Sequence, residues 1–168
     1  MTIEEFNRLE PEAAASVLAA CADIDGWVAQ LLAGRPFDSR DALLASAGAA
    51  AQGWTPGEVD SALAHHPRIG ERPQAEAIGA ANAAHSAGEQ AGVNGADTAT
   101  KQALASGNAD YERRFGRIFL IRAAGRSPEQ ILAALNERLA NDDATEDAVV
   151  AGQLREIALL RLGQAVPG

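Results

Sequence analysis

The sequence predicts an all-α fold, a single-domain helical bundle of roughly eight or more helices that spans residues 1–168. Hydrophobic residues make up 47% of the chain but aromatic residues only 4%. Small aliphatic side chains must therefore fill the core, and an alanine-rich composition favours closely packed helices. Helix-start signals recur along the chain, whereas no parallel-sheet pattern, glycine-rich nucleotide-binding loop or internal repeat is present.

The N-terminal segment begins with two helix-start signals. Thr2 and Glu5 have the spacing of a capping box, in which the two side chains bind the free N–H groups of a first turn. Pro11 suits the first turn of a second helix, which is predicted to reach about Ala22. A third helix is predicted before the GRPF segment at 34–37 from five apolar residues at helical spacing: Ile24, Trp27, Val28, Leu31 and Leu32.

Two further helices are predicted before residue 67. Asp38 can cap a helix that runs towards Gln52. The TPGE sequence at 55–58 combines a threonine cap, a proline at the first position and a glutamate three residues after the cap. The helix that it opens is predicted to end at His65 and His66.

Between residues 67 and 97 the helical pattern weakens. This segment contains five glycines and alternates small and polar residues, so only short helical pieces are expected. A segment of roughly 30 residues with so little regular structure is unusual in a compact domain and is more often functional than not.

The C-terminal part of the chain returns to helical patterns. A helix is predicted over 98–115, followed by a short apolar run at 118–121 that could be extended. The SPEQ sequence at 127–130 is another capping box, and it opens a helix to about residue 140. The last helix is predicted over 145–162, with Gly163 placed to stop it.

The charge and cysteine content exclude several classes of function. The formal net charge of −9 argues against a nucleic-acid backbone or an anionic membrane as partner. Cys21 is the single cysteine, and no spacing typical of a metal site appears. No signal peptide or membrane span is recognisable. We expect a protein of the cytoplasm, with no metal and no cofactor.

Two adjacent histidines form the first candidate site. His65 and His66 stand where a helix is predicted to end, and a partly cationic imidazole would suit that end of the helix dipole. Because His66 precedes Pro67, it is pushed out of the helical conformation and its ring is aimed away from the helix. A helix-end role and an acid–base role both remain open at this point.

A second candidate lies in the HSAGEQ sequence at 85–90. Ser86 and Glu89 have capping-box spacing, which explains both residues without any function. Gln90 has no such explanation, and an adjacent carboxylate and amide can clamp the N–H and C=O groups of a urea-like ligand.

The third candidate is an arginine in the last predicted helix. At about 100° per residue, Arg161 falls within the apolar stripe of Val150, Leu154 and Ile157, whereas Arg155 lies towards the polar side. An arginine on a buried face requires a partner because its charge does not titrate away. That partner could be a structural carboxylate or a bound ligand.

Taken together, these segments resemble the family of OHCU decarboxylases, where OHCU is 2-oxo-4-hydroxy-4-carboxy-5-ureidoimidazoline. The matching segments run in order along nearly the whole chain: GRPF at 34–37, HHPRIGE at 65–71, Ser86-x-x-Glu89-Gln90, the stretch 111–142 and REIALLRL at 155–162. The resemblance implies an all-α homodimer that converts OHCU to (S)-allantoin and carbon dioxide, the last step from urate.

The resemblance also implies a set of site residues, without a metal or cofactor. His66 and Glu89 would be catalytic, and the substrate would be bound by Pro67, Ser86, Gln90, the backbone at Ile121, and Arg161. Arg155 is the alternative to Arg161, and the position of Arg161 on the apolar face is the reason for preferring it. The opposing hypotheses are a non-catalytic helical module that binds ureides or other partners on the same scaffold, and a ureide hydrolase.

Overall fold

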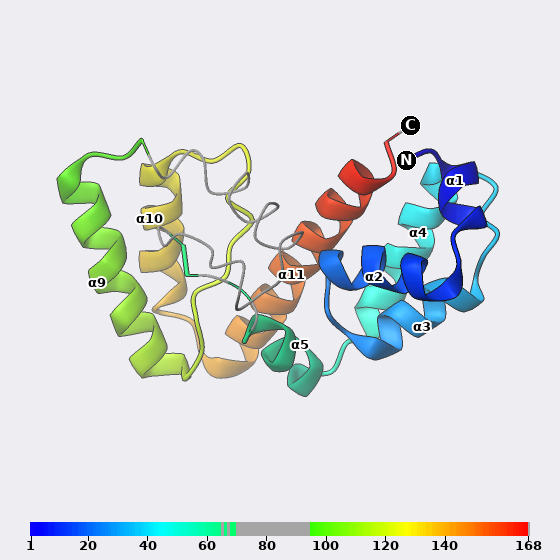
Figure 1. Cartoon of the computed structure of the whole chain (residues 1–168). Helices are drawn as coiled ribbons and strands as arrows, with labels where there is room; N and C mark the ends of the chain where they lie inside the picture. Colours follow the sequence, from blue (N-terminus) through cyan, green and yellow to red (C-terminus); the bar gives the residue numbers. More distant parts are fainter. Residues whose placement is uncertain (65, 67, 70–94, 168) are drawn as a thin grey trace. The chain divides into compact units, whose positions relative to one another are not determined.

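The computed structural model describes residues 1–64, 66, 68–69 and 95–167 (Figure 1). These residues form eight α-helices and one 3₁₀ helix, and no β-strand occurs among them. The prediction of an all-α fold is confirmed. The chain divides into two compact units, one made of Met1–Ala62 with Leu154–Gly168 and the other of Leu63–Gln153.

The first unit contains the N-terminal helices and the end of the last helix. Its elements are α1 (Ile3–Arg8), α2 (Pro11–Cys21), α3 (Asp25–Ala33), α4 (Arg40–Ala50), η1 (Ala51–Gly53), α5 (Pro56–Leu63, whose last residue belongs to the second unit) and the C-terminal part of α11 (Asp143–Ala165). The predicted capping box of Thr2 and Glu5 is present. The predicted cap at Asp38 is wrong, because the hydroxyl of Ser39 accepts the N–H of Ala42 at 3.1 Å and the helix begins one residue later.

Aliphatic side chains and one tryptophan form the interior of the first unit. Figure 1 shows α2, α3 and α4 following one another, and α3 packs against both of its neighbours. Trp27 on α3 is buried, and its indole N–H donates to the carbonyl oxygen of Ala47 on α4 at 3.0 Å. The same unit buries Leu154, Ile157 and Leu162 of α11.

Helix α11 continues past the glycine that was predicted to stop it. It runs to Ala165, so Gly163 lies inside it. A Cβ at Gly163 would come within 2.8 Å of Nη2 of Arg40. The Arg40 side chain donates to the carbonyl oxygens of Gly163 at 3.4 Å and Val166 at 3.0 Å. An arginine from α4 therefore binds the carbonyl groups at the end of the helix.

The second unit contains α9 (Thr98–Phe115), α10 (Pro128–Arg138) and the first part of α11. Helix α9 has the bounds predicted from the sequence, and it ends at Gly116, whose φ of 68° is left-handed. Ser127 and Gln130 form the predicted capping box of α10. Helix α11 begins two residues earlier than predicted, because Asp142 accepts the N–H of Thr145 at 2.7 Å.

Helices α9 and α10 enclose the core of the second unit. This core cluster consists of eight buried residues: Ile69, Leu104, Tyr111, Phe119, Ile121, Ala123, Ile131 and Leu135. The two helices approach closely at Gly107, where a Cβ would lie 2.4 Å from a methyl carbon of Leu135. Four of the eight residues come from outside the two helices, so the connecting segments are part of the core.

Candidate active site

His66 lies just beyond the end of α5. The helix ends at Leu63, so the prediction that it continues to the two histidines is wrong, whereas the placement of His66 past the helix is confirmed. The backbone N–H of His66 donates to the carbonyl oxygen of Leu63 at 3.0 Å, which forms a tight last turn. The His66 side chain is half-buried. His65 and Pro67 lie outside the described residues.

The residues after His66 are fixed to α9 by two contacts. Arg68 forms a two-pronged ion pair with Glu112, with distances of 2.5 Å and 3.0 Å, and its hydrogen bond lowers the pKa of the Glu112 carboxyl. Ile69 is buried in the core cluster, and its carbonyl oxygen accepts the side-chain amide N–H of Asn108 at 3.1 Å. The chain is therefore held in place three residues from His66.

Ile121 belongs to the same core cluster as Ile69 and is 7% exposed. It lies in a segment without regular secondary structure between α9 and α10. The peptide groups on both sides of Ile121 are bonded, since the Leu120 carbonyl accepts from Arg138 at 2.7 Å and the Arg122 N–H donates to Gln153 Oε1 at 2.9 Å. No described residue accepts a hydrogen bond from the Ile121 N–H itself.

A buried charged cluster supports this segment. Its members are Tyr111, Arg138, Asn141 and Glu146, and we call it the Arg138 cluster. The Glu146 carboxylate is fully buried and accepts hydrogen bonds from the Tyr111 hydroxyl, from Nε and Nη2 of Arg138 at 2.8 Å and 2.5 Å, and from Asn141 at 2.8 Å. Burial raises the pKa of the Tyr111 hydroxyl, so it remains a donor. A buried ion pair with every oxygen bonded is well compensated for its loss of water.

Sequence reasoning missed the Arg138 cluster, although a signal for it was available. Arg138 follows Ile131 by seven residues and Leu135 by three, so all three share one face of α10, and all three are buried. Glu146 precedes Val150 by four residues on the buried face of α11. Helical periodicity, which places Arg161 on a buried face, therefore also predicts that Arg138 and Glu146 are buried.

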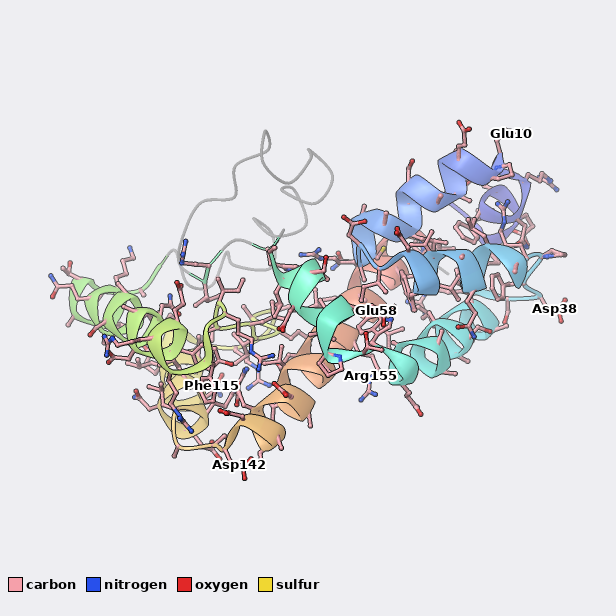
Figure 2. All side chains as sticks on the ribbon, turned by 90° about the horizontal axis from the view of Figure 1, so that it is seen from below. Glu10, Asp38, Glu58, Phe115, Asp142 and Arg155 are labelled. Atoms are coloured by element: carbon pink, nitrogen blue, oxygen red, sulfur yellow. The ribbon has the colours of Figure 1, made fainter. Side chains whose placement is uncertain are left out.

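Arg161 belongs to the first unit and is 1% exposed. The prediction that it lies on the apolar face of the last helix is confirmed, because Val150, Leu154 and Ile157 are buried with it. Its Nη1 lies 3.5 Å from the carbonyl oxygen of Ala20 on α2. Arg155, labelled in Figure 2, is only half-buried.

The remaining predicted site residues, Ser86, Glu89 and Gln90, lie outside the described residues. An open cavity of about 550 Å³ occurs in the second unit, lined by Arg122, Arg126 and Glu137 among others. Of the predicted site residues that the structure describes, neither His66, Ile121 nor Arg161 lines this cavity.

No group of three or more His, Cys, Asp or Glu residues is placed to hold a metal ion in the part of the chain that the structure describes. None of the described helices combines the length and the apolar character that crossing a membrane requires.

The chain is similar to known proteins along nearly its whole length. Residues 7–163 match the family model described as OHCU decarboxylase. A 2-oxo-4-hydroxy-4-carboxy-5-ureidoimidazoline decarboxylase of Haloferax volcanii is 27% identical over 165 residues, which cover 98% of this chain and 95% of that protein. A protein of the same description from Amia calva is 32% identical over 136 residues, 80% of this chain and 76% of the relative.

A solved structure has the same fold. It is described as OHCU decarboxylase in the presence of (S)-allantoin, and it superposes with a TM-score of 0.74 at 23% identity, over 93% of this chain and 97% of that one. Because the family model spans the chain from α1 to α11, the segments that suggested the family are all included in the match. The chain belongs to the OHCU decarboxylase family.

Proposed function

We propose that the chain acts as a carboxy-lyase that removes carbon dioxide from OHCU during urate breakdown and yields (S)-allantoin. The match of residues 7–163 to the family model is the observation that carries this proposal. It also supports treating residues 1–168 as one functional domain, with the two compact units contributing to the same activity.

The reaction needs no external electron sink. When the bond between the ring carbon and the carboxylate breaks, its electron pair forms a double bond to the neighbouring ring carbon, the C=N electron pair moves onto the ring nitrogen, which takes up a proton, and carbon dioxide leaves. The hydroxyl on the first carbon then loses its proton to become a carbonyl, and the neighbouring carbon receives a proton on one face, which gives a single stereoisomer. The protein's task is to orient the carboxylate out of the ring plane, donate hydrogen bonds to the developing negative charge and deliver that proton.

We assign the acid–base role to His66, because an imidazole titrates near working pH. The tight turn at Leu63 and the anchoring of Ile69 support this assignment, since both restrict the backbone around His66. Glu89 would orient or relay the proton while binding ring or ureido N–H groups. We expect Pro67, Ser86 and Gln90 to bind the ureido side of the substrate.

Two further contacts complete the proposal. The Ile121 N–H would donate to a ring carbonyl, and the bonded peptide groups on either side of it support this role. Arg161 would bind an oxygen-rich part of the ligand. Its burial supports that choice over Arg155, and its charge would attract an anion that a protein of net charge −9 otherwise repels.

The activity can be tested with freshly generated OHCU, followed by circular dichroism as optically active allantoin forms. The protein must produce optical activity faster than buffer does, and His66→Ala and Glu89→Ala must abolish the gain. His65→Ala is the matched control, because it removes the neighbouring imidazole and should retain activity. Racemic product at the uncatalysed rate would contradict the proposal.

A non-catalytic ureide-binding module is the second candidate, and ligand binding separates it from the enzyme. Allantoin should raise the melting temperature of both kinds of protein, since binding to the native state stabilises it. Only an enzyme also loses turnover in His66→Ala while the variant remains folded. We further propose a homodimer in the cytoplasm, and light scattering of the purified chain would test its subunit number.

A further inference from the structure

Within the Arg138 cluster, Arg138 is the residue whose side chain hydrogen-bonds to the backbone of the Ile121 segment. It is 7% exposed, and its guanidinium lies 4.5 Å from the centroid of the Phe119 ring. Nε and Nη2 bind Glu146, whereas Nη1 donates to the Leu120 carbonyl oxygen at 2.7 Å. The fork of the guanidinium therefore joins a buried carboxylate to one particular peptide group.

That peptide group is the one that contains the Ile121 N–H. The Leu120 carbonyl and the Ile121 N–H belong to the same planar trans peptide and point in opposite directions. Fixing the carbonyl therefore fixes the direction of the N–H. A cationic donor on the carbonyl oxygen also draws electron density from the nitrogen, so the N–H becomes a stronger donor.

The following peptide group is fixed independently. The Arg122 N–H donates to Gln153 Oε1 on α11 at 2.9 Å. Ile121 itself is held by the core cluster. The Ile121 N–H thus lies between two peptide groups that are fixed by hydrogen bonds. A hydrogen-bond donor whose orientation is already fixed needs no reorganisation when charge develops on a ligand.

We propose that Arg138 is a positioning residue for the decarboxylation, which orients and polarises the Leu120–Ile121 peptide so that the Ile121 N–H stabilises negative charge developing on the substrate. This inference rests on the proposed function and deepens it, because Arg138 would act through the main chain without touching the ligand. Glu146, Tyr111 and Asn141 hold the guanidinium in the orientation that reaches Leu120.

The first test is Arg138→Lys, which keeps the charge but cannot bridge Glu146 and Leu120 with the same planar fork. Loss of a whole oxyanion donor typically costs 10²–10³ in kcat, so a weakened donor should lower kcat by about tenfold. KM should change by less than about twofold, since the contact strengthens mainly in the transition state. Arg114→Lys is the matched control, because Arg114 also binds backbone carbonyls, those of Leu139 and Asn141.

A spectroscopic measurement reports the polarisation of the Leu120–Ile121 peptide group directly. In nitrogen–proton correlation spectra, the Ile121 amide resonance should move upfield in Arg138→Lys and stay in place in Arg114→Lys. This readout does not depend on activity. If Arg138→Lys does not fold, the double variant Arg138→Met/Glu146→Met removes both buried charges together and leaves neither unpaired, so it is expected to fold.

The outcomes separate the two proposals. If the wild-type chain does not decarboxylate OHCU, the proposed function fails, whatever the spectra show. If the wild-type chain is active but the folded Arg138 variants keep kcat within about twofold of wild type, the positioning role is wrong and the cluster is only structural. An unmoved Ile121 resonance in a folded Arg138 variant would overturn the polarisation argument as well.

Discussion

Replacing Tyr111 with phenylalanine tests the energetics of the Arg138 cluster. Tyr111 is fully buried, and its hydroxyl donates one of the four hydrogen bonds that the Glu146 carboxylate accepts. Its ring packs against Phe115 and Phe119, and phenylalanine would keep both contacts. The variant therefore removes the hydrogen bond that the hydroxyl donates to Glu146 and the longer one, 3.3 Å, that it accepts from Nη2 of Arg138, and little else.

The shorter hydrogen bond, to the charged carboxylate, dominates the expected loss of about 1.5–3 kcal/mol. Three donors remain on Glu146, so its buried charge is not left unpaired. Urea denaturation should show a lower midpoint with an unchanged slope, because the surface exposed on unfolding is the same. Ser16→Ala removes an exposed hydroxyl on α2 and should change stability by less than about 0.5 kcal/mol.

The same variant has a predictable pH dependence. Burial raises the pKa of Tyr111 above the ordinary tyrosine value of 10.0, so the stabilisation from its hydroxyl is fully present below pH 10 and is lost as pH rises further. The stability advantage of the wild type over Tyr111→Phe should shrink above that pH by up to about 1.4 kcal/mol per pH unit. Tyr111 is the only tyrosine of the chain, so tyrosinate absorbance reports it alone.

Two results would refute this reasoning. A stability change below about 0.5 kcal/mol in Tyr111→Phe would mean that the hydroxyl contributes no more than a surface group. If the hydroxyl of Tyr111 ionised in the folded protein near the ordinary tyrosine pKa of 10.0, it would not be held in the buried cluster.

The other predictions concern the support of the His66 segment and the packing of the helices. Glu112→Gln should destabilise the protein by less than about 1 kcal/mol at neutral pH, because the pair with Arg68 is partly exposed. The hydrogen bond from Arg68 lowers the pKa of Glu112 from 4.5, so the stability difference between wild type and Glu112→Gln should be lost as pH falls below that value. Thermal melts of the two proteins over a series of pH values would measure it. Gly152→Ala should stabilise α11 by up to about 1 kcal/mol in urea denaturation. Gly107→Ala should not gain stability, because the added methyl group would clash with Leu135. An equal gain in both variants would contradict the close approach of α9 and α10 at Gly107.

The helices were predictable because their signals are local. The capping boxes at Thr2 and Ser127 are present as predicted, since a cap depends on residues three positions apart. The end of α11 was misplaced because it depends on a residue distant in the sequence. Arg40, more than 120 residues from Gly163, is the side chain that binds the carbonyl groups at the end of α11.

The site was predictable only in part, for a related reason. Arg161 could be placed on a buried face because helical periodicity alone determines which side of α11 it occupies. The bond from Arg138 to Leu120 could not be predicted, because it joins a helix to an irregular segment 18 residues earlier. Periodicity indicates that a charge is buried but does not identify its partner.

A contact made through the main chain has a consequence for mutational tolerance. Any residue except proline supplies a backbone N–H at position 121, so substitutions there should be limited by the volume available in the core cluster and not by ligand chemistry. Selection for the activity should instead act on positions that never meet the substrate, with Arg138 and Gln153 foremost. A saturation library scored for turnover should therefore accept several aliphatic residues at Ile121 and almost none in place of Arg138.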